Sequence, residues 1–222
     1  MVDMLSLACL LSYHLTVVVA SVTTGCIDKT SPSSACCSGD IELDPTLTTV
    51  GSNAFHGCSS LTSVVIGNVM ETISSQDFSG CNGLISLSLP STVTAIGSDA
   101  FWNCNGITSA LVLPSGLNTL DSGAFGYCSG LSGDLIIPDD LSSIGNTAFR
   151  SCTSLTGLTV PDSVHTIEHS VFKDCTGLTY ITYYSGTALG TEAFEGTVTP
   201  TVLTHAPTSY PTSPSGEPTG QP

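Results

Sequence analysis

The hydrophobic positions of the chain recur in a short frame, which is clearest between residues 84 and 104. Leu87 and Leu89 alternate with serines, and Pro90 follows directly. Alternation of apolar and polar residues predicts a β-strand with one buried face. Pro90 ends this strand, because proline lacks a backbone N–H and fixes φ for a turn.

The second half of the frame predicts a shorter extended piece followed by a corner. Residues 93–96 turn their apolar side chains inward, and Gly97 permits a tight corner. Asp99 is suited to cap the next turn, and Phe101 lies in a single helical or 3₁₀ turn. Cys104 closes the coil, and the next strand begins about three residues later.

The ending Ala-Phe-x-x-Cys recurs along most of the chain. The seven phenylalanines are separated by 23, 23, 24, 24, 23 and 22 residues. A fixed period of this length predicts a solenoid, in which each coil is stable only against its neighbours. The two longer intervals add one residue before the strand, at Ser109-Ala110 and Gly133-Asp134. An insertion there lies in a corner and leaves the core register intact. The rings are expected to stack, at Phe55, Phe78, Phe101, Phe125, Phe149, Phe172 and Phe194.

The two ends of the chain differ from the array at residues 41–203. Residues 1–20 are largely apolar and end in small residues, which favours a signal peptide; a buried strand or an uncleaved anchor are the alternatives. Residues 21–40 form an N-terminal cap region. Residues 204–222 are rich in Pro, Thr and Ser, which predicts a disordered tail, either an O-glycosylated stalk or a bare linker.

The charge balance excludes one class of partner. Three basic residues stand against 18 acidic ones, for a net charge of −15. Nucleic-acid binding depends on Lys and Arg, so no nucleic acid is expected, and docking on anionic membranes is disfavoured. Beyond the N-terminal residues no run approaches the ~18 apolar residues of a membrane span. We expect no span in the mature chain.

The frame L-x-x-L-x-L-P-x-x-V-x-x-I-G-x-x-A-F-x-x-C resembles the leucine-rich repeats of the BspA-like (surface antigen) class. The resemblance implies a leucine-rich-repeat solenoid of about seven stacked coils of 22–24 residues. A parallel β-sheet would line one face, with short strands or helical turns on the other. Members are mostly extracellular or surface proteins that act in adhesion and recognition, and they are not known as enzymes. No cofactor is implied. The first and last copies depart from the frame at Asp44, Gly186 and Thr197, as capping or decayed repeats do.

Six of the ten cysteines occupy one position of the repeat. Stacked residues have parallel Cβ vectors, which do not converge as a disulfide requires, so a buried column of free thiols is expected. No metal site is expected there, because this spacing is not a zinc pattern. In the cap region Cys26 is expected to pair with Cys36 or Cys37, since such solenoids often carry a disulfide-closed cap. The column comprises Cys58, Cys81, Cys104, Cys128, Cys152 and Cys175.

The string His165-Thr-Ile-Glu168-His169 matches the H-x-x-E-H order of one class of zinc protease. That motif works on a helix, where its two histidines share one face. Ile167 occupies the buried position of an extended piece, which points both histidines outward. We therefore interpret them as solvated side chains and predict no catalytic residue and no metal ligand.

Residues between the buried leucines point outward and form the candidate ligand face. This surface is small and hydroxyl-rich, with Val65, Val112 and Ile136 among its outward residues and Asp134 as its one charge. It is either ordinary solvated strand surface or a repetitive surface for a protein loop or a polysaccharide. The candidate residues are Thr62, Ser63, Ser86, Ser88, Thr108, Ser109, Ser132, Thr156, Thr159, Thr179, Tyr180 and Thr182.

The main functional hypothesis is a secreted or cell-surface recognition and adhesion module, not an enzyme, which binds an extracellular protein or polysaccharide as a monomer. A structural wall or matrix protein without a specific ligand is the alternative. An ice- or crystal-binding solenoid is a third hypothesis, motivated by the threonines, but Ile85 interrupts their column.

Overall fold

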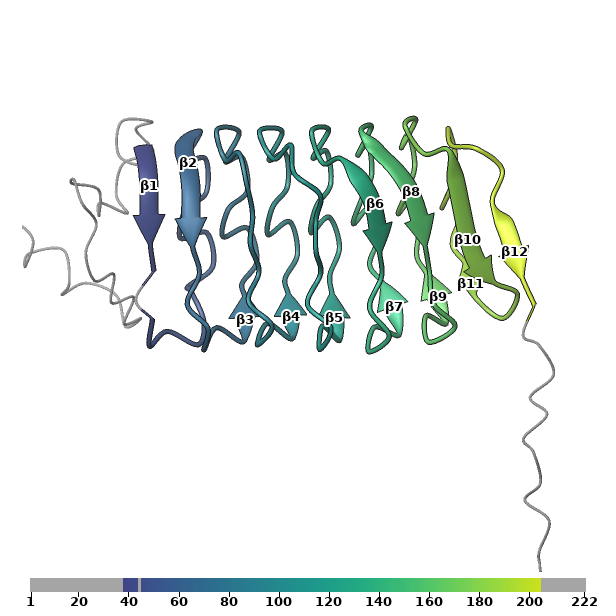
Figure 1. Cartoon of the computed structure of the whole chain (residues 1–222), viewed down its shortest axis with the longest axis horizontal. Helices are drawn as coiled ribbons and strands as arrows, with labels where there is room; N and C mark the ends of the chain where they lie inside the picture. Colours follow the sequence, from purple (N-terminus) through teal and green to yellow (C-terminus); the bar gives the residue numbers. More distant parts are fainter. Residues whose placement is uncertain (1–37, 44, 205–222) are drawn as a thin grey trace, which may run out of the picture.

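The computed structural model describes residues 38–43 and 45–204. They form a single stack of coils, one per phenylalanine, which we number 1 to 7 from Phe55 to Phe194 (Figure 1). The expected solenoid with parallel strands is confirmed. The predicted signal peptide, most of the cap region with Cys26, Cys36 and Cys37, and nearly all of the tail lie outside the described residues.

Each coil passes once across a face of longer strands, here called the strand face, and once across a face of two-residue strands. All strand pairs are parallel. The strand face carries β1 (Ser38–Glu42), β2 (Ser60–Val65), β6 (Gly133–Ile136), β8 (Leu155–Thr159), β10 (Tyr180–Tyr184) and β12 (Thr201–Leu203). The opposite face carries β3 (Thr72–Ile73), β4 (Ala95–Ile96), β5 (Thr119–Leu120), β7 (Ser143–Ile144), β9 (Thr166–Ile167) and β11 (Ala188–Leu189).

The strand face is interrupted in its middle. β1 pairs with β2, and β6, β8, β10 and β12 form one sheet, but coils 3 and 4 cross this face without an assigned strand (Figure 1). Single backbone bonds from Ile85 N to Thr62 O (3.1 Å) and from Thr108 N to Ile85 O (3.2 Å) join coils 2, 3 and 4. Within the described part of the chain, no backbone hydrogen bond joins residues 109–113 to coil 5. The strands of the opposite face also divide there, into β3-β4-β5 and β7-β9-β11, but a backbone hydrogen bond from Gly145 N to Leu120 O at 3.0 Å joins coils 4 and 5 on this side.

The phenylalanine rings form a continuous stack through the solenoid. Successive ring centroids lie 5.1–5.6 Å apart with interplanar angles of 1–7°. The five inner rings are fully buried, whereas Phe55 and Phe194 at the two ends are partly exposed. Buried aliphatic residues, such as Leu84, Ile96 and Leu117, fill the rest of the interior. Ring burial is therefore shared between coils, which ties the spacing of one coil to that of the next.

The segments around the phenylalanines are series of turns, and no helix occurs among the described residues. In every coil the residues two before and two after the phenylalanine have positive φ, for example Asp99 (55°) and Asn103 (59°). Helices need negative φ, so these positions prevent the helical turn expected at Phe101. The fourteen residues are Asn53, Gly57, Gln76, Gly80, Asp99, Asn103, Gly123, Tyr127, Thr147, Ser151, Ser170, Asp174, Glu192 and Gly196.

Backbone hydrogen bonds between successive turns offset the cost of this conformation. The N–H groups of Asp99, Phe101 and Asn103 donate to carbonyls of coil 4 at 2.9, 2.8 and 2.8 Å. A left-handed L-residue costs about 1–2 kcal/mol, and each hydrogen bond contributes roughly 0.5–1.5 kcal/mol. The turns are therefore stable only in the stack, where a neighbouring coil supplies the acceptors.

The corner glycine is required for close packing between coils. Gly97 has no positive φ, in contrast to the expectation from the sequence that it would relax a tight corner. A Cβ at this position would lie 2.8 Å from the backbone N of Ser75 in coil 2. Gly145 and Gly190 hold the same corner in coils 5 and 7, and a Cβ there would also clash with the preceding coil, whereas Ser74, Asp121 and Glu168 hold it in coils 2, 4 and 6.

Five of the six cysteines in the repeat position are free and buried, namely Cys81, Cys104, Cys128, Cys152 and Cys175. Each thiol donates to the phenylalanine carbonyl of the preceding coil, as from Cys128 Sγ to Phe101 O at 2.9 Å. Burial raises the pKa of Cys175 to about 12. The free-thiol interpretation is wrong at Cys58, which is disulfide-bonded. Its partner is not among the described residues.

We predict that Phe125→Ala lowers the free energy of unfolding by about 3–5 kcal/mol, because it opens a cavity at the centre of the ring stack. Phe55→Ala is the matched control and should cost less, since its ring is partly exposed at the end of the stack. Chemical denaturation followed by circular dichroism measures both. Equal losses in the two variants would contradict a stack whose strength depends on having neighbours on both sides.

We predict that the five free thiols resist iodoacetamide at pH 8 in the folded protein. Alkylation requires the thiolate, and burial raises the pKa of Cys81 and Cys152 far above pH 8. Proteolysis and mass spectrometry should show carbamidomethylation at these positions only after unfolding in guanidinium. Rapid modification of Cys128 in the native chain would overturn the prediction.

Candidate ligand-binding face

The outward residues of the strand face form two rows that run along the solenoid. The pleat of a strand alternates its side chains between the core and the surface, which explains the rows. Strand pairing aligns Ile136 with Thr159 and Thr159 with Thr182. The outer row, defined by this register and by repeat position, is Glu42, Val65, Ser88, Val112, Ile136, Thr159, Thr182 and Thr201. The middle row is Asp40, Ser63, Ser86, Ala110, Asp134, Gly157 and Tyr180.

All twelve candidate residues from the sequence lie on this face, and none of them is buried. They are spread over six coils, from Thr62 to Thr182, and so do not converge on one point. Several hydroxyls already have partners in the protein. Ser132 Oγ donates to Thr108 O at 2.6 Å, and Thr179 Oγ1 donates to Thr156 O at 2.9 Å. Much of the hydroxyl content of the face therefore joins neighbouring coils.

The sequence-based selection omitted the aliphatic side chains of the same face. Val112 is 76% exposed and Ile136 is 69% exposed, the highest values among the large hydrophobic residues described. Val65 and Ile85 are more than half exposed on coils 2 and 3. Their signal in the sequence is a branched aliphatic residue at a position where other repeats carry Ser or Thr.

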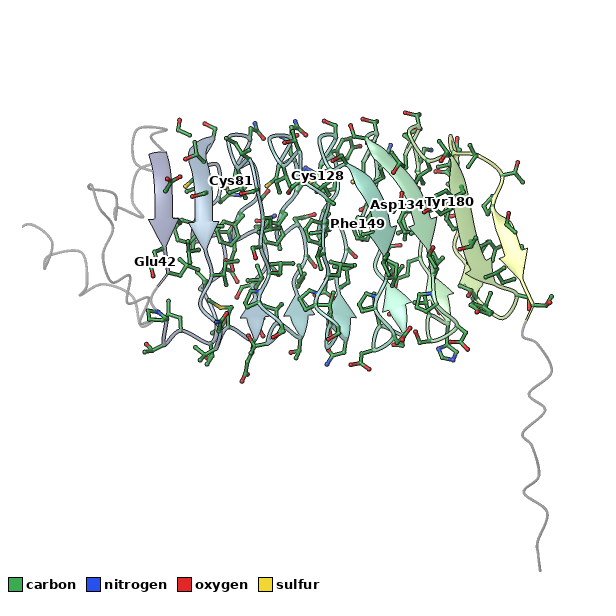
Figure 2. All side chains as sticks on the ribbon, in the orientation of Figure 1. Glu42, Cys81, Cys128, Asp134, Phe149 and Tyr180 are labelled. Atoms are coloured by element: carbon green, nitrogen blue, oxygen red, sulfur yellow. The ribbon has the colours of Figure 1, made fainter. Side chains whose placement is uncertain are left out.

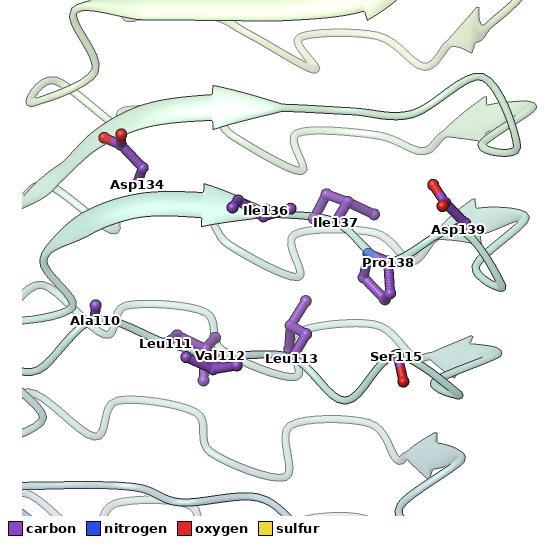
Figure 3. Close-up of a pocket in the computed structure, with 10 residues that line it drawn as sticks. All are labelled: Ala110, Leu111, Val112, Leu113, Ser115, Asp134, Ile136, Ile137, Pro138 and Asp139. Carbon is purple, nitrogen blue, oxygen red and sulfur yellow. The ribbon is translucent and has the colours of Figure 1, made fainter. Parts of the chain in front are cut away.

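A groove lies between coils 4 and 5, where the strand face is interrupted. It has a volume of about 440 Å³ and is lined by residues of 110–115 and 134–139 (Figure 3). Val112, Leu113, Ile136 and Ile137 supply its apolar middle. Each lining segment follows one of the two extra residues that lengthen the spacing between successive phenylalanines from 23 to 24 residues. The insertions thus keep the core register, as expected, and the groove opens beside them.

Asp134 lies at one end of this groove and accepts two hydrogen bonds from later coils. Thr156 Oγ1 donates to Asp134 Oδ1 at 2.7 Å, and Tyr180 Oη donates to Asp134 Oδ2 at 2.6 Å (Figure 2). These bonds, that of Tyr180 first, lower the pKa of Asp134, because they stabilise its carboxylate. The same bond raises the pKa of Tyr180, since the neutral phenol is the donor.

Gly157 makes this contact between Asp134 and Tyr180 sterically feasible. It lies between them in the middle row, and a Cβ there would come within 2.2 Å of Tyr180 Cζ. Tyr180 reaches from coil 7 to coil 5 across the glycine, with its own side chain 44% exposed. The three residues therefore form one fixed, polar and partly aromatic element on an otherwise hydroxyl-bearing sheet.

Asp40 repeats the arrangement at the N-terminal end of the strand face. Thr62 Oγ1 and Ser63 Oγ donate to Asp40 Oδ1 at 2.8 and 2.7 Å. These bonds, that of Ser63 first, lower the pKa of Asp40. Glu42 lies two residues further along the same strand. The strand face therefore carries ionised carboxylates at both of its sheets.

The basic side chains of the described residues lie in the phenylalanine turns. Lys173 Nζ contacts Glu192 at 2.8 Å and Glu195 at 2.9 Å, and Arg150 lies over the Tyr127 ring at 5.6 Å. Each directly follows the phenylalanine of its coil. Carboxylates on the strand face consequently have no basic partner in the described part of the chain.

The H-x-x-E-H string lies on the opposite face, where β9 is an extended strand and not the helix that the zinc motif needs. His165 and His169 are exposed at the two ends of β9. His169 Nδ1 lies 2.5 Å from Thr191 Oγ1, and its Nε2 lies 3.1 Å from Ser170 Oγ. Among the described residues, no group of three or more potential ligands gathers to hold a metal ion. No helix there has the length and apolar character to cross a membrane.

A family model described as "BspA type Leucine rich repeat region" matches residues 33–150 and 107–205, with six copies of the repeat. Among curated proteins, none matches the chain.

Solved structures of bacterial leucine-rich repeat proteins share the fold. One from Bacteroides ovatus is 27% identical with a TM-score of 0.67, over 72% of this chain and 41% of that protein. One from T. pallidum is 25% identical with a TM-score of 0.63, over 71% of this chain and 75% of that protein. One from Eubacterium ventriosum, at 23% identity and a TM-score of 0.57, covers 78% of this chain and 45% of that protein. The chain therefore spans less than half the length of two of these three proteins.

We predict that Asp134→Asn lowers the pKa of the Tyr180 phenol toward its ordinary value. The carboxylate accepts a hydrogen bond that stabilises the neutral phenol, and an amide oxygen without the negative charge accepts it more weakly. NMR titration of protein labelled at the tyrosine Cζ carbons reports the pKa. Thr156→Val is the control, because it removes the other donor and leaves the phenol bonded. An unchanged Tyr180 titration in Asp134→Asn would contradict the contact.

Proposed function

Because the chain belongs to the BspA-type leucine-rich repeat family, we propose that it is a secreted or cell-surface recognition and adhesion module. It binds an extracellular protein or polysaccharide through the strand face. Leucine-rich-repeat solenoids present extended surfaces for interaction, and this one repeats an outward side chain at the same position of every coil, on both sides of the gap in its strand face.

The observation that carries the proposal is the pair of exposed aliphatic residues, Val112 and Ile136, on adjacent coils of that face. Single exposed hydrophobic residues are common on protein surfaces, but neighbouring ones above an apolar groove are typical of interaction sites. Val65 and Ile85 are further exposed aliphatic residues of this face, on coils 2 and 3. A purely structural role in a wall or matrix does not require aliphatic side chains to be exposed to solvent on this face.

An ice- or crystal-binding role has weaker support. Such a surface needs a long regular array, and threonines align over only three positions of the outer row, Thr159, Thr182 and Thr201. Ile136 and Val112 continue the row on the next coils, where the strand pairing also ends. A recognition surface with varied side chains fits the row better.

The test is a steric block on each face of the same two coils. Ser88→Trp/Thr159→Trp places two bulky rings on the strand face of coils 3 and 6, and Thr94→Trp/His165→Trp places them on the opposite face of those coils. All four positions are exposed. We expect ligands from an array of polysaccharides and extracellular proteins to lose at least about 10-fold in affinity for the first variant only.

Equal losses in both variants, or unaltered binding in the strand-face variant, would reject this face as the binding surface. If no member of the array binds the native chain, the structural alternative is favoured.

A further inference from the structure

The groove between coils 4 and 5 has a distinctive distribution of polar and apolar groups. Figure 3 shows its lining residues along two successive coils, with Asp134 toward one end and Asp139 toward the other. Between them lie the aliphatic side chains of Val112 and Ile136. The result is an apolar middle with an aspartate at each end; the Asp134 carboxylate points toward coil 6, where it meets Thr156.

Charge determines which partner suits this groove. Asp134 and Asp139 are exposed, Asp140 adjoins them, and both basic residues of the described chain lie in the phenylalanine turns. Hydrogen bonds from Tyr180 and Thr156 keep Asp134 ionised and use about two of its four acceptor positions. A cation therefore finds both unneutralised charge and free lone pairs, whereas the net charge of −15 repels acidic partners.

The apolar middle favours a polypeptide over a polysaccharide. Branched aliphatic side chains offer contact area without hydrogen-bonding groups, so hydroxyl-covered sugars would lose water there without replacement. Aliphatic side chains of an extended peptide gain from the same burial. Asp139 follows Asp134 by five positions, which limits the span between them to roughly 17 Å, and an extended peptide covers that span with about five residues.

We infer that this groove binds an extended polypeptide segment with aliphatic residues flanked by two basic residues four or five positions apart. The inference rests on the proposed use of the strand face and names the chemistry of the partner at one place on it. Apolar contacts with Val112 and Ile136 supply affinity, while Asp134 and Asp139 set the direction and register of the segment.

The test uses a phage library of random linear 12-residue peptides, selected on the immobilised full chain. Val112→Ser/Ile136→Ser serves for counter-selection, and Ile85→Ser is its control, because Ile85 is exposed on the same face outside the groove. We expect enriched peptides to carry Arg or Lys on both sides of aliphatic residues. One synthetic peptide should bind the double variant at least about 10-fold more weakly than the native chain, and Ile85→Ser as tightly as the native chain.

Asp134→Asn and Asp139→Asn, made together, should weaken the same peptide and flatten the dependence of its affinity on salt, because exposed charge pairs are screened. Enrichment of acidic or uncharged peptides, no enrichment, or equal binding to the groove variants would overturn the inference.

Two outcomes separate this inference from the proposed function. The ligands found in the array of polysaccharides and proteins can lose binding to Ser88→Trp/Thr159→Trp and still bind the groove variants normally. In that case the strand face is the binding surface, and the groove is not its peptide site. A polysaccharide that binds at the groove and loses affinity in Val112→Ser/Ile136→Ser also overturns the peptide assignment. If neither tryptophan pair weakens ligand binding, the strand face is not the binding surface and both proposals fail.

Discussion

Hydrogen bonding between successive phenylalanine turns is the constraint on which the rest of the molecule depends. Rings stacked 5.1–5.6 Å apart and N–H groups that donate from Phe101 to Ala124 and from Phe125 to Ala148 fix the distance between coils on this side. The turn conformation has positive φ at two positions per coil, and its N–H groups donate alternately within the turn, as from Trp102 to Asp99, and to the next coil, as from Asn103 to Gly126. Local structure and stacking are therefore one cooperative event, as expected of a solenoid whose repeats have no separate core.

Because spacing is fixed on the phenylalanine side, the strand face is free to depart from an ideal sheet. Coils 3 and 4 cross it without assigned strands, yet Leu87, Leu111 and Leu113 remain buried beneath. Stability and surface are thus partly decoupled. Packing in the interior tolerates little change in the buried residues. The identity of the outward side chains is constrained mainly by the molecules that contact them.

The sequence contains the period, the inward leucines and the stacked phenylalanines, because burial imposes one residue class at each of these positions. It does not reveal that Asp99 and Asn103 adopt positive φ, since those positions hold many residue types and are set by bonds to the next coil. Cys58 looks identical to the other cysteines of its column, but it is disulfide-bonded. The contact between Asp134 and Tyr180 spans 46 residues and needs Gly157 in between, so no local pattern could indicate it.

The extra residue before the strands of coils 4 and 5 has an evolutionary consequence. A repeat protein grows by copying units, and copies with identical surfaces would offer the same ligand contacts at every coil. A one-residue insertion at Ser109-Ala110 or Gly133-Asp134 changes the surface locally while Leu113 and Ile137 keep their buried places. Duplication thus supplies the scaffold, and small length changes at this single corner let individual copies acquire a binding specificity of their own.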